Sequence, residues 1–195
     1  MKKLDLHTIP AVAILNLLVV VLVGTLAIEI ALEPTALIDG HAISYFATLP
    51  RTFWPHLIGG LAAGLLTLAL AERITPSHAL LKWCLTLIGT CSLLLQLFRI
   101  GTSHFNFVVH VILASVLFFT LCACVVGSSL RLRNRTNARL SILMLLAYTL
   151  NVVSFYVQSP AWLGLPLGQI LVAGIFVVWL HINLRREKSL ISTVY

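Results

Sequence analysis

Apolar residues dominate the chain in six long runs, and short polar stretches separate these runs. A helix needs about 20 predominantly apolar residues to cross the hydrocarbon core of a bilayer, and each run approaches or exceeds that length. The pattern predicts transmembrane helices at about residues 10–32, 55–71, 80–98, 106–128, 140–157 and 165–184. We therefore expect an all-α fold, a six-transmembrane-helix bundle that forms one domain over residues 1–195.

The longest stretch between two runs, residues 33–54, differs from an ordinary polar loop. Its second half reads HAISYFATLPRTFW and is semi-apolar, aromatic and interrupted by Pro50. Tyr and Trp favour the level of the lipid headgroups. The composition therefore predicts a short segment that lies in the membrane interface, on the outer side of the bundle.

Positive charges are distributed unequally between the two sides that six crossings create. Of the 13 Lys and Arg residues, only Arg51 and Arg99 fall on the side of the 33–54 loop. Cytoplasmic loops carry an excess of Lys and Arg, so this distribution predicts that both termini are cytoplasmic. We expect a multi-pass protein of the inner (plasma) membrane of a bacterial cell, with its first helix retained and not cleaved as a signal peptide.

The composition supports this interpretation and excludes two others. The chain is 59% hydrophobic and 10% charged, whereas a soluble domain is about 25% charged. The net charge of +7 could indicate nucleic acid as a partner, but the charges lie in short loops between apolar runs, so we expect none. The four cysteines lie in apolar runs without the spacing of a zinc site or a disulfide framework.

Polar side chains at membrane depth gather toward the predicted outer side. They are expensive there and usually face a protein interior or a water-filled cavity. This clustering predicts an outward-facing polar pocket beneath the 33–54 loop, with a lipid headgroup or a small amphiphile as its ligand. The candidate ligand-binding residues are Glu29, His56, Gln96, Arg99, Asn106, His110 and Tyr156.

Two candidates lie deeper than the others and need partners. His110 is about one helical turn inside the fourth run, with Asn106 four residues earlier on the same face. Glu29 lies about one turn from the outer end of the first run, where a Glu–His or Glu–Arg pair would compensate its burial. For both residues, structural hydrogen bonding and ligand contact remain open, whereas Arg99 is better explained as an interfacial side chain.

The sequence contains no recognisable catalytic motif. It lacks Gly-x-Ser-x-Gly, His-Glu-x-x-His and a phosphate-binding glycine loop, so we assign no catalytic residue. No two histidines have metal-ligand spacing within one helix, so we expect neither a metal site nor a cofactor. The alternative is a membrane enzyme or a haem-linked redox protein that uses His56 and His110 on facing helices.

Three short segments carry a resemblance to a known family. They are ISYFAT (Ile43–Thr48), HVILASVLFF (His110–Phe119) and WLGLPLGQ (Trp162–Gln169). With one helix, a semi-apolar outer loop and five closely spaced helices, the chain resembles the DRAM/Frag/Sfk superfamily, in particular its uncharacterised bacterial branch of six-helix membrane proteins. The resemblance implies a polytopic membrane protein with relatives linked to lipid handling, and it implies no catalytic residue.

These observations favour a non-enzymatic protein that binds membrane lipid or organises a membrane protein partner. A third interpretation is an accessory subunit of a larger membrane complex, or a homo-oligomer. A lipid-facing stripe of small residues, Gly60 and Gly64, buried against another chain would indicate such an assembly.

Overall fold

The computed structural model describes residues 10–39, 41–100, 102–132, 134–157 and 165–186, and this part of the chain is all-helical. Six of its helices are long and apolar enough to cross a membrane, as the sequence predicts. They are α1 (Ala11–Leu32), α3 (Phe53–Ala71), α4 (Ala79–Leu97), α5 (His104–Leu132), α6 (Arg135–Val157) and α7 (Leu165–Arg186). The shorter helices are α2 (Pro34–Ile38), η2 (Ile43–Thr48) and η3 (Pro76–His78), the last two of the 3-10 type.

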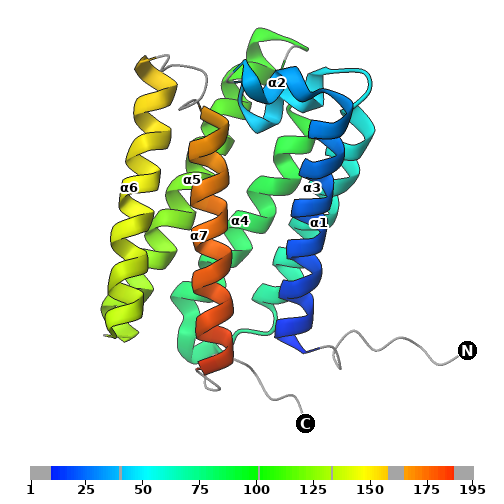
Figure 1. The fold of residues 1–195 in the computed structure, drawn as a ribbon. Coiled ribbons are helices and arrows are strands. Elements are labelled where there is room, and N and C mark those ends of the chain that lie inside the picture. The colour runs from blue at the N-terminus through cyan, green and yellow to red at the C-terminus, as the bar shows by residue number, and fades with distance from the viewer. Residues whose placement is uncertain (1–9, 40, 101, 133, 158–164, 187–195) are drawn as a thin grey trace, which may run out of the picture.

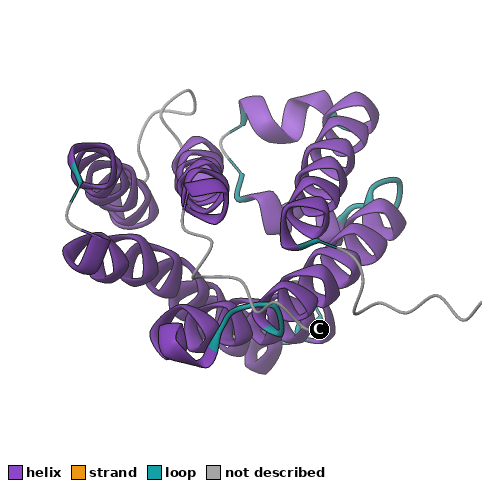
Figure 2. Ribbon diagram, turned by 90° about the horizontal axis from the view of Figure 1, so that it is seen from below, coloured by secondary structure: helices purple, strands orange, loops and turns teal. Residues whose placement is uncertain are grey.

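The six long helices form a closed ring. Each packs against its neighbour in the chain, α1 and α7 close the ring, and α7 also contacts α5 (Figures 1 and 2). The start of α1 and the end of α7 lie together at the bottom of Figure 1, which we call the basic end. The short helices α2 and η2 cover the other end, which we call the capped end (Figure 1).

Two helices extend further than the sequence predicts. Helix α5 continues to Leu132 and α6 begins at Arg135, whereas the predicted runs ended at Ser128 and began at Leu140. The arginine-rich stretch was interpreted as a loop because it is polar, yet Arg and Leu are good helix formers. Asn134 starts α6 with a side-chain cap, in which its Oδ1 accepts a hydrogen bond from the Asn137 N–H at 2.8 Å.

The apolar core fills the basic half and the middle of the ring. Among the residues that have almost no exposed surface are Leu15 of α1, Leu85 of α4, and Trp179 and Leu180 of α7. They belong to one continuous cluster with side chains from every long helix. Because lipid is as apolar as these side chains, close packing and hydrogen bonds hold such helices together. The basic half and the middle of the bundle therefore share one apolar core.

Small residues bring α3 and α4 into close contact. A Cβ added at Gly64 would lie 3.1 Å from the Gly89 carbonyl oxygen, and one at Gly89 would lie 3.0 Å from the Gly64 carbonyl oxygen. Gly60, one turn from Gly64, packs against the side-chain amide of Gln96. The proposed stripe of Gly60 and Gly64 therefore packs inside the chain, against α4, and not against another chain.

A reciprocal amide pair joins α6 to α7 near the basic end. Asn137 and Asn183 are buried, and each side-chain amide donates to the other's Oδ1 at 3.1 Å. The Asn183 amide also donates to the Trp179 carbonyl at 2.7 Å. Both polar side chains are therefore fully engaged within the protein.

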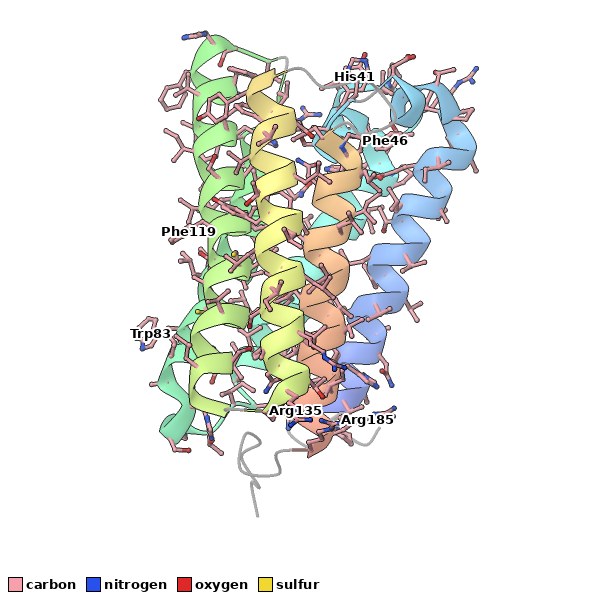
Figure 3. All side chains as sticks on the ribbon, turned by 60° about the vertical axis from the view of Figure 1, so that its left-hand side comes forward. His41, Phe46, Trp83, Phe119, Arg135 and Arg185 are labelled. Atoms are coloured by element: carbon pink, nitrogen blue, oxygen red, sulfur yellow. The ribbon has the colours of Figure 1, made fainter. Side chains whose placement is uncertain are left out.

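The outer surface of the ring suits a lipid environment. Large apolar side chains point away from the bundle, among them Trp83 and Phe119, which are 73% and 61% exposed (Figure 3). Apart from Arg51 and Arg99, the described Lys and Arg residues gather at the basic end, where Figure 3 shows Arg135 and Arg185. The other described Lys and Arg residues at this end are Arg73, Lys82, Arg139 and Arg186. The remaining cations of that side, Lys2, Lys3, Arg131, Arg133 and Lys188, lie outside the described side chains.

Candidate functional site

A buried acid–histidine pair joins α1 to α3 in the capped half. Glu29 is 1% exposed, and its Oε1 lies 2.8 Å from His56 Nδ1, whose side chain is 15% exposed. A buried carboxylate without a partner would cost several kcal/mol, and the imidazole compensates that cost with a hydrogen bond. The sequence predicted a histidine or an arginine as the partner of Glu29, and in the structure the partner is His56.

The segment that covers the capped end is anchored at several points. Phe46 of η2 is 1% exposed, and its carbonyl accepts a hydrogen bond from the buried Thr52 hydroxyl at 2.6 Å. The Ile43 N–H donates to Gln169 Oε1 of α7 at 2.9 Å. The expected interfacial segment is therefore a folded cap, tied to α7 at one end and to the start of α3 at the other.

His110 is held by the end of α4. Its Nδ1 lies 2.7 Å from the Phe98 carbonyl oxygen, and the residue is 4% exposed. A carbonyl only accepts hydrogen bonds, so Nδ1 carries the proton. The other ring nitrogen, Nε2, is buried and has no hydrogen-bond partner among the described residues.

A cavity of about 470 Å³ lies beneath the cap, between α5, α6 and α7. Ligand pockets in proteins commonly measure about 300–1,000 Å³, are mostly apolar and contain a few polar groups. The wall here has that character. Its apolar and aromatic side chains include Phe107, Phe118, Tyr148, Phe155 and Leu165, and its polar ones include His41, His110, Ser115, Asn151 and Gln169.

Two polar atoms of this wall have unused hydrogen-bonding capacity. His110 Nε2 and Asn151 Oδ1 are both buried, and neither has a partner among the described residues. Nearly all buried polar atoms in folded proteins are hydrogen-bonded, so each exception needs an explanation. Among the described side chains, only one other buried polar atom lacks a hydrogen-bond partner, Trp179 Nε1 in the basic half. His110 and Asn151, by contrast, line the same cavity.

The structure separates the seven candidate residues into three groups. His110 and Tyr156 line the cavity, Tyr156 with most of its surface exposed. Glu29 and His56 pair with each other and are not among the residues that line the cavity.

The remaining three candidates make local contacts. The Arg99 guanidinium lies 4.3 Å from the centre of the Phe53 ring, a cation–π contact. The Asn106 amide donates to the Thr102 hydroxyl at 2.5 Å, and Gln96 packs against Gly60. None of the three belongs to the cavity lining.

Asn151 and Gln169 were not among the candidate residues, although both line the cavity. Each is a lone amide in an apolar run, and polar residues at membrane depth usually face the interior of a bundle. That signal could have selected them. What the sequence could not supply was their position relative to His110, because the three residues lie on three different helices.

The described residues contain no group of three or more His, Cys, Asp or Glu side chains that could hold a metal ion. All four cysteines are buried and free of disulfides. The site is thus a cavity with neutral polar groups in an otherwise apolar wall. Comparison of the chain with protein-family models, with curated proteins and with solved structures finds no match.

Proposed function

We propose that this chain is a multi-pass membrane protein that binds a lipid or small amphiphile in the cavity of the capped end, and that it needs no catalytic chemistry to do so. One observation carries the proposal: His110 and Asn151 line the same cavity, and each has a buried polar atom without a partner. A ligand with a polar head and an apolar tail would satisfy those atoms and fill the apolar wall.

The proposed orientation places the capped end outside an inner (plasma) membrane and both termini in the cytoplasm. The unequal distribution of Lys and Arg supports it. In that orientation the basic end faces the anionic lipids of the cytoplasmic leaflet, which attract basic residues by about 1 kcal/mol each near the surface. Membership of the DRAM/Frag/Sfk superfamily, with its links to lipid handling, remains part of the same proposal.

Native mass spectrometry of the detergent-extracted protein tests the function directly, because it reports bound lipid and stoichiometry together. We expect the protein to retain lipid and the His110→Ala variant to retain much less. His78 lies at the opposite end of the bundle, in η3, and provides the matched His78→Ala control. Equal lipid content and equal thermal stability of the two variants would remove His110 from the site, and the measured mass would reveal a homo-oligomer or protein partner.

A second candidate function, a haem-linked redox protein or membrane enzyme, has one observation in its favour. Histidines that ligate metals usually hold their other ring nitrogen on a carboxylate or a backbone carbonyl. His56 and His110 both do so, on Glu29 and on the Phe98 carbonyl. An absorbance spectrum of the purified protein decides between the two functions, since a Soret band would displace lipid binding as the leading proposal.

A further inference from the structure

The hydrogen-bond roles of two cavity residues are fixed by backbone partners. The Phe98 carbonyl forces His110 Nδ1 to be the donor, so Nε2 of the neutral ring is an acceptor with no donor among the described residues. The Ile43 N–H forces Gln169 Oε1 to be the acceptor, so the groups that Gln169 has left to offer are amide N–H donors.

Asn151 adds a second unsatisfied acceptor to the same wall. It is 8% exposed, and its Oδ1 is buried without a partner among the described residues. A ligand that only accepts hydrogen bonds would leave this oxygen and His110 Nε2 unsatisfied, at a cost of about 1–3 kcal/mol for each buried group. The wall therefore selects for a ligand that carries a donor.

The charges around the cavity narrow the choice further. No Lys, Arg, Asp or Glu is among its described lining residues. A phosphate or carboxylate headgroup would enter without a Lys or Arg to compensate its desolvation, and an ammonium headgroup would enter without a carboxylate. A hydroxyl is neutral, donates one hydrogen bond and accepts others, which matches an acceptor on His110 and donors on Gln169.

We propose, building on the lipid-binding function above, that the ligand is a neutral, hydroxyl-bearing lipid, of the class of long-chain alcohols, glycerides and sterols. Its hydroxyl donates to His110 Nε2 and accepts from the Gln169 amide, and in a ligand with a second hydroxyl, such as a monoglyceride, that second hydroxyl donates to Asn151 Oδ1. Its apolar body lies against the aromatic side chains of α5 and α6, such as Phe118 and Phe155. His110 is therefore the residue that determines headgroup specificity.

Competition between one crosslinking probe and three lipids that differ in their head group tests this inference. The detergent-solubilised protein is photo-crosslinked with a diazirine-bearing octadecanol in the presence of oleyl alcohol, oleate or methyl oleate. Oleyl alcohol has a donor and no charge, oleate has a charge, and methyl oleate has neither donor nor charge. We expect oleyl alcohol to halve the crosslinking at a concentration about tenfold lower than either of the others.

The His110→Phe variant removes the acceptor and keeps an aromatic ring. We expect it to bring oleyl alcohol and methyl oleate within about twofold of each other, whereas the His78→Phe control keeps the tenfold difference. Should His110→Phe fail to fold, the ranking on the unaltered protein decides on its own.

The possible outcomes separate this inference from the function on which it rests. If oleate or methyl oleate competes as well as oleyl alcohol, the cavity binds amphiphiles but the requirement for a donor is wrong. If none of the three competes, lipid binding in this cavity and the hydroxyl specificity fall together. A tenfold preference that survives His110→Phe would assign the specificity to another residue and overturn the role of His110.

Discussion

The Asn137–Asn183 pair of the basic half and the cavity of the capped half treat buried polar side chains in opposite ways. In the basic half, Asn137 and Asn183 satisfy each other, and the space around them is filled by apolar side chains. In the capped half, His110 and Asn151 each retain an unsatisfied atom beside a cavity of about 470 Å³. The same helices cross both halves, so the difference is local.

The largest expected effect comes from the buried hydrogen bond between Glu29 and His56 in the capped half. His56→Ala should lower the free energy of unfolding by about 3–5 kcal/mol, because it leaves the carboxylate of Glu29 buried without its partner. Denaturation in mixed micelles measures the change. The double variant Glu29→Gln/His56→Ala should recover part of it, and a single variant as stable as the original protein would show that the pair is not needed to hold α1 against α3.

Added volume should distinguish a filled region from a hollow one. Ala147 of α6 is buried in the core, and Ala114 of α5 lines the cavity. Ala147→Leu should destabilise by about 1–3 kcal/mol through overpacking, whereas Ala114→Leu should change stability by less than about 0.5 kcal/mol. Thermal unfolding of each variant measures both changes in stability. Equal destabilisation by both substitutions would mean that the cavity cannot accept a side chain, and hence not a ligand either.

The same substitution, asparagine to leucine, can be made in each half of the bundle, so that the two changes in stability are directly comparable. Asn183→Leu should cost about 1–2 kcal/mol, because it strands the Asn137 amide in an apolar interior. Asn151→Leu should be neutral or slightly stabilising in protein stripped of lipid, because that Oδ1 has no hydrogen bond to lose. Unfolding of both variants after delipidation provides the measurement. A large loss of stability in Asn151→Leu would reveal a structural role and weaken the binding proposal.

The smallest effect belongs to an exposed ion pair at the basic end. Lys82 Nζ lies 3.6 Å from Glu72 Oε2, with the side chains 37% and 71% exposed. Lys82→Ala should change stability by no more than about 0.5 kcal/mol, because solvent screens the pair. Comparison with His56→Ala tests whether a paired side chain stabilises this protein more when it is buried. Similar losses of stability in the two variants would contradict that explanation.

The order and the approximate extent of the six helices are predictable from the sequence. Runs such as residues 10–32 are apolar on all sides, and a helix is the structure that satisfies their backbone in lipid. The ends are less predictable, as α5 and α6 show, because a polar stretch such as RLRNRTNAR can be helical or extended, and the Asn134 cap is what fixes the start of α6. The need of Glu29 for a partner also follows from its depth alone.

The sequence by itself therefore determined the helical class, the number of helices that are long and apolar enough to cross a membrane, and the scarcity of polar groups within them. Only the tertiary structure decided which of those groups meet. It paired Glu29 with His56, turned Gln96 into a packing contact for Gly60, and placed Asn151 and Gln169 beside His110. The physical reason is that apolarity along a chain is a local property, whereas a cavity depends on how helices distant in sequence are rotated about their axes, and that rotation is set by many small packing contacts at once.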